Sequence, residues 1–133
     1  YNKPVLIKIS PDLTHPQIDN ILVLVKKFNI SGLIATNTSS RRDNLKTPKH
    51  IIENKGMGGL SGKPLYFKSK ETVSYIHKKS SGTIPIIAVG GIMSAKDAIE
   101  MLNAGASLVQ IYTGFIYNGP SLIRSINKKL LES

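Results

Sequence analysis

The apolar residues of this chain follow two patterns, short continuous runs and longer stretches with helical spacing. Four runs have the length and composition of buried strands, and they cover residues 5–9, 32–38, 84–89 and 108–114. The first run is almost entirely apolar, which is typical of a parallel strand covered on both faces. Each run ends in polar or glycine residues able to hold an anionic ligand. The candidate chemistry therefore gathers at the carboxyl ends of the strands.

A helix is predicted after each strand, although a long irregular stretch from Ser39 to Leu65 follows the second one. Thr14 and Gln17 form a capping box before the first helix, and Ser94 with Asp97 is an N-cap signal for a later one. A patternless loop of 27 residues, counted from 39 to 65, is usually functional or disordered. The residues expected on the inner faces of the helices are Ile18, Ile21, Leu22, Val25 and Phe28; Val73 and Ile76; Ala98, Ile99 and Leu102; and Leu122, Ile123, Ile126 and Leu130.

Four consecutive strand–helix units predict an α/β fold with a parallel sheet. Right-handed crossovers would close such a sheet into a (β/α)8 TIM barrel if four more units were present, so residues 1–133 are expected to form one partial barrel domain. A free-standing doubly wound sheet is the alternative, and the positions of the glycine-containing turns favour the barrel. The chain starts at Tyr1 rather than Met, and we interpret this start as a cut through a longer protein.

Composition and charge narrow the classes of function. A net charge of +10 could indicate a nucleic-acid binder, but most lysines fall on the polar faces or ends of predicted helices, and aromatic residues make up only 6%. Solvated helix faces explain this charge better, so no nucleic-acid partner is expected. No run approaches the ~18 apolar residues that span a bilayer. The chain lacks cysteine and its three histidines lie far apart, so no metal site is expected.

Two glycine-containing turns are candidates for a phosphate site. Gly90-Gly91 and Tyr112-Thr113-Gly114 end the third and fourth predicted strands. Glycine lets the backbone approach a phosphate, and successive N–H groups direct positive dipoles towards it. Tight turns without a ligand are the alternative interpretation. Two such turns on neighbouring strand ends favour phosphate binding, because these loops form the phosphate site of many barrels.

Two further strand positions carry candidate polar chemistry. Lys8 lies in an otherwise apolar strand and could point into a barrel to hold positive charge against a ligand, or could face solvent from an edge strand. Asn37 lies between two threonines at a strand end, where its amide could bind a planar ring through a donor and an acceptor. Polar residues that only make a turn would look the same.

Taken together, the segments resemble the C-terminal half of class 2 dihydroorotate dehydrogenase, that is, its last four strand–helix units. The resemblance covers essentially the whole chain, and its glycine-rich segment is specific, with a Lys-Pro-Leu ending that favours class 2 over class 1. The segments are Lys8-Ile-Ser-Pro-Asp-Leu13, Thr36-Asn-Thr38, Gly58-Gly-Leu-Ser-Gly-Lys-Pro-Leu65, Val89-Gly-Gly91 and Ala104-Gly-Ala-Ser-Leu-Val-Gln-Ile-Tyr-Thr113.

The resemblance implies an FMN enzyme of pyrimidine biosynthesis that oxidises dihydroorotate to orotate and passes electrons to a membrane quinone. It implies a peripheral membrane location, on the cytoplasmic side of a bacterial inner membrane or at the mitochondrial inner membrane. By position, Asn37 and Thr38 match residues that hold orotate. Lys8 matches the lysine beside the pyrimidine edge of the flavin. The other matched flavin-binding residues, the last three around its phosphate, are Thr36, Gly62, Gly91, Tyr112 and Thr113.

The same resemblance implies that part of the machinery lies elsewhere. The serine base of the family and its membrane-docking, quinone-receiving helices belong to the N-terminal half, and Ser61 of the glycine-rich loop does not match that base. We therefore expect no catalytic residue in this segment and no turnover by it alone. A phosphate- or nucleotide-binding half-barrel without redox activity is the alternative. Bound FMN that dihydroorotate never reduces would favour that alternative.

Overall fold

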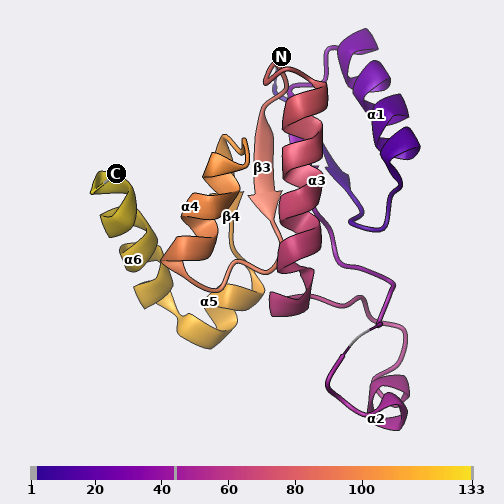
Figure 1. Ribbon diagram of the computed structural model, residues 1–133, viewed down its shortest axis with the longest axis vertical. Coiled ribbons are helices and arrows are strands. Elements are labelled where there is room, and N and C mark those ends of the chain that lie inside the picture. The colour runs from indigo at the N-terminus through magenta and orange to yellow at the C-terminus, as the bar shows by residue number, and fades with distance from the viewer. Residues whose placement is uncertain (1–2, 44, 133) are drawn as a thin grey trace.

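A computed structural model, which describes residues 3–43 and 45–132, contains one parallel sheet of four strands (Figure 1). The strands are β1 (Leu6–Ile9), β2 (Gly32–Ala35), β3 (Ile86–Val89) and β4 (Leu108–Gln110), and they lie side by side in chain order. All three pairings are parallel. The predicted parallel α/β sheet is thus confirmed.

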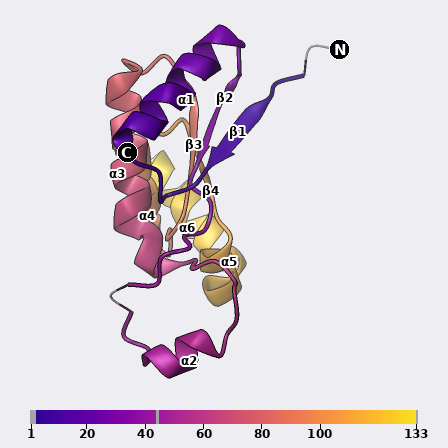
Figure 2. The ribbon, with the colours of Figure 1, turned by 90° about the vertical axis from the view of Figure 1, so that its right-hand side faces the viewer.

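The helices cover one face of this sheet and leave the other face open. Helices α1 (His15–Lys27), α3 (Tyr66–Lys79) and α4 (Ala95–Asn103) lie on the same side of the strands, and α6 (Pro120–Leu131) packs beside α4 (Figure 2). A doubly wound sheet carries helices on both faces. Strands in sequential order with helices on one side are instead the arrangement of a barrel segment, as predicted.

The covered face forms the core. Val73 and Ile76 of α3 are fully buried against β2 and β3, as the helical spacing predicted. In α4 the fully buried residues are Ala98, as predicted, and Met101, whereas the predicted Ile99 is only half-buried. Phe28 was predicted to face the sheet, and this was wrong, because α1 ends at Lys27 and Phe28 is 63% exposed. The same prediction was wrong for Ile123 of α6, which is 43% exposed.

The predicted helix boundaries have clear local causes. The side-chain oxygen of Gln17 accepts a hydrogen bond from the backbone N–H of Thr14 at 2.8 Å, which completes one half of the capping box of α1. The Ser94 hydroxyl accepts from the backbone N–H of Asp97 at 3.2 Å and begins α4. Gly105, at φ +109°, turns the chain after α4 into β4.

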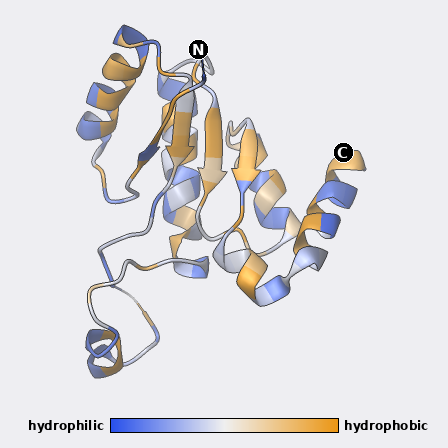
Figure 3. Ribbon diagram, turned by 180° about the vertical axis from the view of Figure 1, so that it is seen from behind, coloured by the Kyte–Doolittle hydropathy of each residue, from blue (hydrophilic) through white to orange (hydrophobic). Residues whose placement is uncertain are grey.

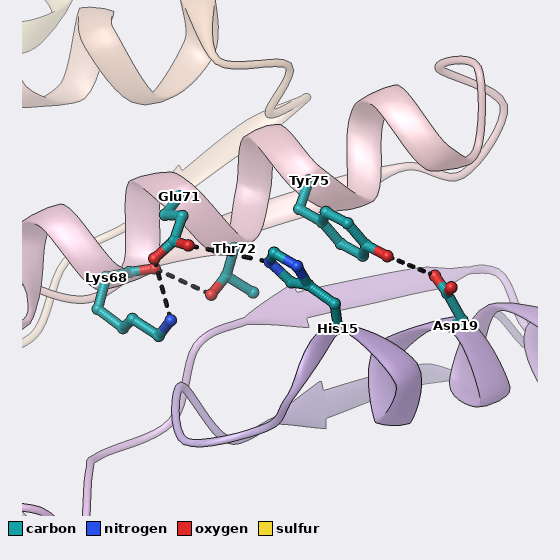
Figure 4. Close-up of polar contacts among 6 residues, drawn as sticks. All are labelled: His15, Asp19, Lys68, Glu71, Thr72 and Tyr75. Atoms are coloured by element: carbon teal, nitrogen blue, oxygen red, sulfur yellow. Dashed lines mark hydrogen bonds and ion pairs between the residues drawn. The ribbon is translucent and has the colours of Figure 1, made fainter.

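Contacts between side chains also join α1 to α3 (Figure 4). The His15 ring stacks on the Tyr75 ring with centroids 3.9 Å apart, and the Tyr75 hydroxyl donates to Asp19 Oδ1 at 2.8 Å. Hydrogen bonds from Lys79 and Tyr75 hold the pKa of Asp19 below its ordinary value. This contact fixes the helix that follows β1 against the helix that precedes β3.

Figure 3 looks onto the side of the sheet opposite to the helices, and its central strands are made mostly of hydrophobic residues. Lys8, Ile34, Ile87 and Leu108 pair in one row across all four strands. Leu108 is 60% exposed. The prediction that the first strand is covered on both faces was wrong in this structure, because β1 is an edge strand and one of its faces carries no helix.

The second and fourth predicted strands are much shorter than expected, and three short helical segments were missed. The second run ends as a strand at Ala35 and the fourth at Gln110, because the chain turns there to form the rim of a cleft. Helix α5 (Thr113–Asn118) begins inside the fourth run. The stretch 39–65 contains helix α2 (Lys49–Glu53), none of whose residues is buried, and the 3-10 helix η1 (Lys63–Leu65). Lack of an inward-facing apolar pattern hid α2.

Candidate functional site

A cleft of about 350 Å³ opens at the carboxyl ends of the strands, within the size range of small-ligand sites. It brings together residues from all four strand ends and from the glycine-rich segment before η1. Every site residue predicted from the sequence lines it, namely Lys8, Thr36, Asn37, Thr38, Gly62, Gly91, Tyr112 and Thr113. These positions span more than a hundred residues of sequence, so the fold alone brings them together.

Lys8 supplies a positive charge to this cleft from the open face. Its side chain is exposed and β1 is an edge strand, as in the alternative in which Lys8 faces solvent from an edge strand. Lys8 nevertheless lines the cleft, and within the described residues it forms no ion pair. An ammonium group in this position is available to an anionic or electron-rich ligand.

Thr36, Asn37 and Thr38 follow β2 and differ in exposure. Thr36 is 2% exposed, and its backbone N–H donates to the Val89 carbonyl at 2.6 Å. The backbone N–H of Asn37 donates in the other direction, to the Ile9 carbonyl at 2.7 Å. The side chains of Asn37 and Thr38 are exposed in the cleft. The segment is thus anchored to both neighbouring strands while two polar side chains remain accessible.

The first glycine turn fits tightly against α3. Gly91 has φ +76°, and a Cβ atom there would lie 2.5 Å from the backbone nitrogen of Tyr66. Neither the backbone conformation nor the space admits a side chain. The Tyr66 hydroxyl in turn donates to Glu100 at 2.6 Å. Burial is the larger cause and this hydrogen bond the second, and together they raise the pKa of Tyr66 far above its ordinary value.

The second turn, Tyr112-Thr113-Gly114, contacts the glycine-rich segment, and Asn118 at the end of α5 links it to the loop after β3. Gly62 has φ +79°, and a Cβ atom there would lie 2.9 Å from Cγ2 of Thr113. The Thr113 hydroxyl donates to Ser61 Oγ at 3.2 Å. The Asn118 amide donates to the carbonyls of Met93, at 3.3 Å, and Gly114, at 3.0 Å. These contacts bind the loops after β3 and β4 into one unit.

The long segment between β2 and α3 is held by a small set of polar contacts, which begin at the loop between β1 and α1. Asp12 accepts hydrogen bonds from Ser39 Oγ at 2.6 Å and from the N–H and hydroxyl of Ser40 at 2.8 and 2.9 Å. Partial burial raises the pKa of Asp12, but these bonds and the charge of Arg41 outweigh burial and lower it overall. The guanidinium of Arg42 donates to the carbonyls of Ile52, Gly56 and Gly58.

Some residues of the cleft were not among the predicted site residues. Gln110 lines the cleft from β4 and lies on the same face of the sheet as Lys8. The signal was present, because a polar residue inside an apolar strand had already singled out Lys8. Gly90, Ser61, Leu65 and Ile111 also line the cleft. In the described part of the chain, no three His, Asp or Glu side chains are grouped so that they could hold a metal ion, and no helix could cross a membrane.

Comparisons with a family model and with curated proteins both match this chain to one family. The model of the dihydroorotate dehydrogenase family matches residues 1–133. A dihydroorotate dehydrogenase (quinone) of Christiangramia forsetii is 56% identical over 131 residues, which are 98% of this chain and 37% of that protein. One from Synechococcus sp. strain JA-3-3Ab is 51% identical over 126 residues, which are 91% of this chain and 33% of that protein.

A solved structure gives the same result at the level of the fold. The crystal structure of ligand-free DHODH from Eimeria tenella superimposes with a TM-score of 0.84 at 38% identity. The match covers 96% of this chain and 34% of the other. The chain therefore spans about a third of the length of the relatives that it matches.

Proposed function

Because this chain belongs to the dihydroorotate dehydrogenase family, we propose that it is the flavin- and orotate-binding part of a quinone-dependent dihydroorotate dehydrogenase. The observation that carries the proposal is the single cleft in which all eight predicted site residues meet. We propose further that residues 1–133 are the last four strand–helix units of the barrel. The other units would then cover the open face of the sheet.

The chemistry of the cleft supports FMN as its cofactor. Gly91 and Gly62 have positive φ values, and the space that a Cβ atom would take is filled by Tyr66 and Thr113, so both turns are held in one conformation at the cleft. Backbone N–H groups of glycine turns of this kind can bind a phosphate group. Tyr112 and Thr113 add the neighbouring turn, which the Asn118 amide ties to the loop after β3. A dianionic phosphate at this end of the cleft is compatible with the glycine-rich surroundings and with the absence of a lining carboxylate among the described residues.

The other end of the cleft suits a flavin ring and a small planar acid. Lys8 would place its ammonium group beside the pyrimidine edge of the ring, where a cation stabilises negative charge. Thr36 would contact the ring from the end of β2. Asn37 and Thr38 would hold orotate, because an amide and a hydroxyl supply both donors and acceptors to a planar ring. When bound, FMN accepts the electrons of a C–H oxidation and passes them to a quinone.

The base and the quinone site would lie outside this segment. The Ser61 hydroxyl accepts a hydrogen bond from Thr113 in a loop contact, and no carboxylate lines the cleft among the described residues to act as a base. We propose that the serine base, the quinone site and the membrane-docking helices belong to the rest of the protein. The location would be peripheral, at the cytoplasmic side of a bacterial inner membrane or at the mitochondrial inner membrane.

The proposal is tested by anaerobic reduction of the bound flavin. The complete gene product, purified and loaded with FMN, is mixed with dihydroorotate, and the flavin absorbance is followed before and after a quinone is added. The expected result is bleaching by dihydroorotate and recovery with the quinone. Flavin that binds but is never reduced would instead support the non-catalytic binding module. A surface variant, Lys26→Met on the outer face of α1, should show the same bleaching and recovery as wild type.

A further inference from the structure

Two hydroxyl groups meet beneath the floor of the cleft, away from solvent. Thr36 lines the cleft but is only 2% exposed, and Ser69 of α3 is fully buried. Their side-chain oxygens lie 2.9 Å apart, and either can donate the hydrogen bond. Ser69 does not itself line the cleft. Its side chain therefore reaches a ligand only through Thr36.

The loop after β3 closes this pair in. Gly90 has φ +125°, and a Cβ atom there would overlap the Ser69 hydroxyl and lie 3.3 Å from Thr36 Oγ1. The absence of a side chain at Gly90 lets α3 approach the ends of β2 and β3 closely enough for the hydroxyls to bond. The pair is thus fixed by three elements, and its geometry leaves little freedom to either side chain.

The proton count gives the pair a specific property. If Ser69 donates to Thr36, the Thr36 proton is free for another acceptor, and within residues 3–43 and 45–132 this is the Val89 carbonyl at the long distance of 3.5 Å. If Thr36 donates to Ser69, both lone pairs of the Thr36 oxygen are free to accept. Thr36 can therefore face a ligand as a donor or as an acceptor, and Ser69 compensates in either case.

We infer that Ser69 is a positioning residue, which orients the Thr36 hydroxyl and lets it serve as donor or acceptor towards the ring edge of a ligand in the cleft. The inference rests on the proposed function in taking FMN as that ligand. A flavin edge presents both acceptor and donor atoms, so a hydroxyl with a reversible partner can match it in more than one protonation state. An aliphatic or sulfur-containing neighbour of Thr36 would not provide this exchange.

The test compares two substitutions of Ser69 in the complete gene product. Ser69→Ala removes the hydroxyl and leaves a small void, whereas Ser69→Cys fills the site with a slightly larger sulfur atom that offers only a weak hydrogen bond. Both variants should bind FMN about three- to tenfold more weakly than wild type, the range for one neutral hydrogen bond. FMN affinity is measured by quenching of flavin fluorescence. The absorption maxima of the bound flavin should shift in the same direction in both variants.

Two further variants separate positioning from packing. Ser80→Ala removes another buried serine hydroxyl, at the far end of α3, and should leave both FMN affinity and the flavin spectrum unchanged. In a Thr36→Val background, Ser69→Cys should have little further effect, because the two residues act through one contact. If Ser69→Ala fails to fold, Ser69→Cys with this double variant still decides.

The outcomes are distinct. Wild-type affinity and spectrum in Ser69→Cys would overturn the inference, since only packing would then matter. Additive effects of Ser69→Cys and Thr36→Val would overturn it as well. A wild-type protein that binds no FMN would contradict the proposed function itself, and the inference with it.

Discussion

The two faces of the sheet are made by alternate residues of the same four strands, yet they have opposite properties. On the helix-covered face Leu33, Ile86 and Ala88 are completely buried. On the open face Leu6 is 38% and Leu108 is 60% exposed, and Lys8 and Gln110 lie near the cleft. The covered face provides the stability of the segment, while the open face carries the charge and the polar groups of the site. A change of equal size should therefore have different consequences on the two faces.

The largest effect is expected on the covered face. Ile86→Ala removes a fully buried side chain from the centre of the sheet and should destabilise the protein by about 2–5 kcal/mol. Unfolding of the complete gene product in denaturant measures this. The control is Ile123→Ala on α6, where the side chain is 43% exposed and the cost should stay below about 1 kcal/mol. Equal costs for the two variants would remove the distinction between core and surface.

The next effect sharpens the comparison by testing whether the open face stays open. If the remaining barrel units cover this face, Leu108→Ala should cost the complete gene product about 2 kcal/mol, since a buried leucine would be truncated. An uncovered Leu108 would lose almost nothing. A cost no greater than that of Ile123→Ala would contradict the proposal that residues 1–133 are part of a closed barrel.

A smaller stability effect with a larger binding effect is expected at the rim of the cleft. Gly91→Ala places a side chain at φ +76° and against the backbone of Tyr66, which should cost about 1–3 kcal/mol and displace the turn. FMN affinity, measured by fluorescence quenching, should fall at least about tenfold. Gly58→Ala is the matched control, because no atom lies within 4 Å of a Cβ built there. Equal FMN affinities of the two glycine variants would exclude Gly91 from a phosphate site.

The smallest effect concerns the polar contact between the β1–α1 loop and residues 39–40. The pKa of Asp12 lies below its ordinary value of 3.8 in the folded protein, so its stabilising effect is present above that value and is lost as the pH falls through the folded-state pKa. Asp12→Asn should therefore reduce the drop in melting temperature between pH 7 and pH 3. The exposed Asp43→Asn variant serves as control. An unchanged acid dependence in Asp12→Asn would show that the contact contributes nothing.

Much of the fold could be predicted because periodicity reports burial directly. The apolar spacing in α3 identified Val73 and Ile76, and the caps at Thr14 and Ser94 gave two helix starts. The same reasoning failed where burial is absent. Helix α2 buries nothing and so leaves no apolar pattern, and β1 reads as covered on both faces although one face is open in this segment.

The candidate site was predictable for a different reason. Lysine, glycine and small polar residues at strand ends identified positions that a parallel sheet brings together, whereas Gly62 was assigned only through the family resemblance, and all eight predicted residues line the cleft. The supporting contacts were not predictable in the same way. Ser69 contacts the site residue Thr36, Asp12 holds residues 39–40, and Asn118 ties the last turn to the loop after β3, and only packing in three dimensions selects these partners.

The most direct test of the central claim is a crystal structure of the complete gene product with FMN and orotate. The account predicts the phosphate against Gly91 and Thr113, the pyrimidine edge of the flavin beside Lys8, and orotate in contact with Asn37 and Thr38. The helix-free face of the sheet should be covered by other parts of the protein. Flavin bound away from the cleft between these four strand ends would contradict the account.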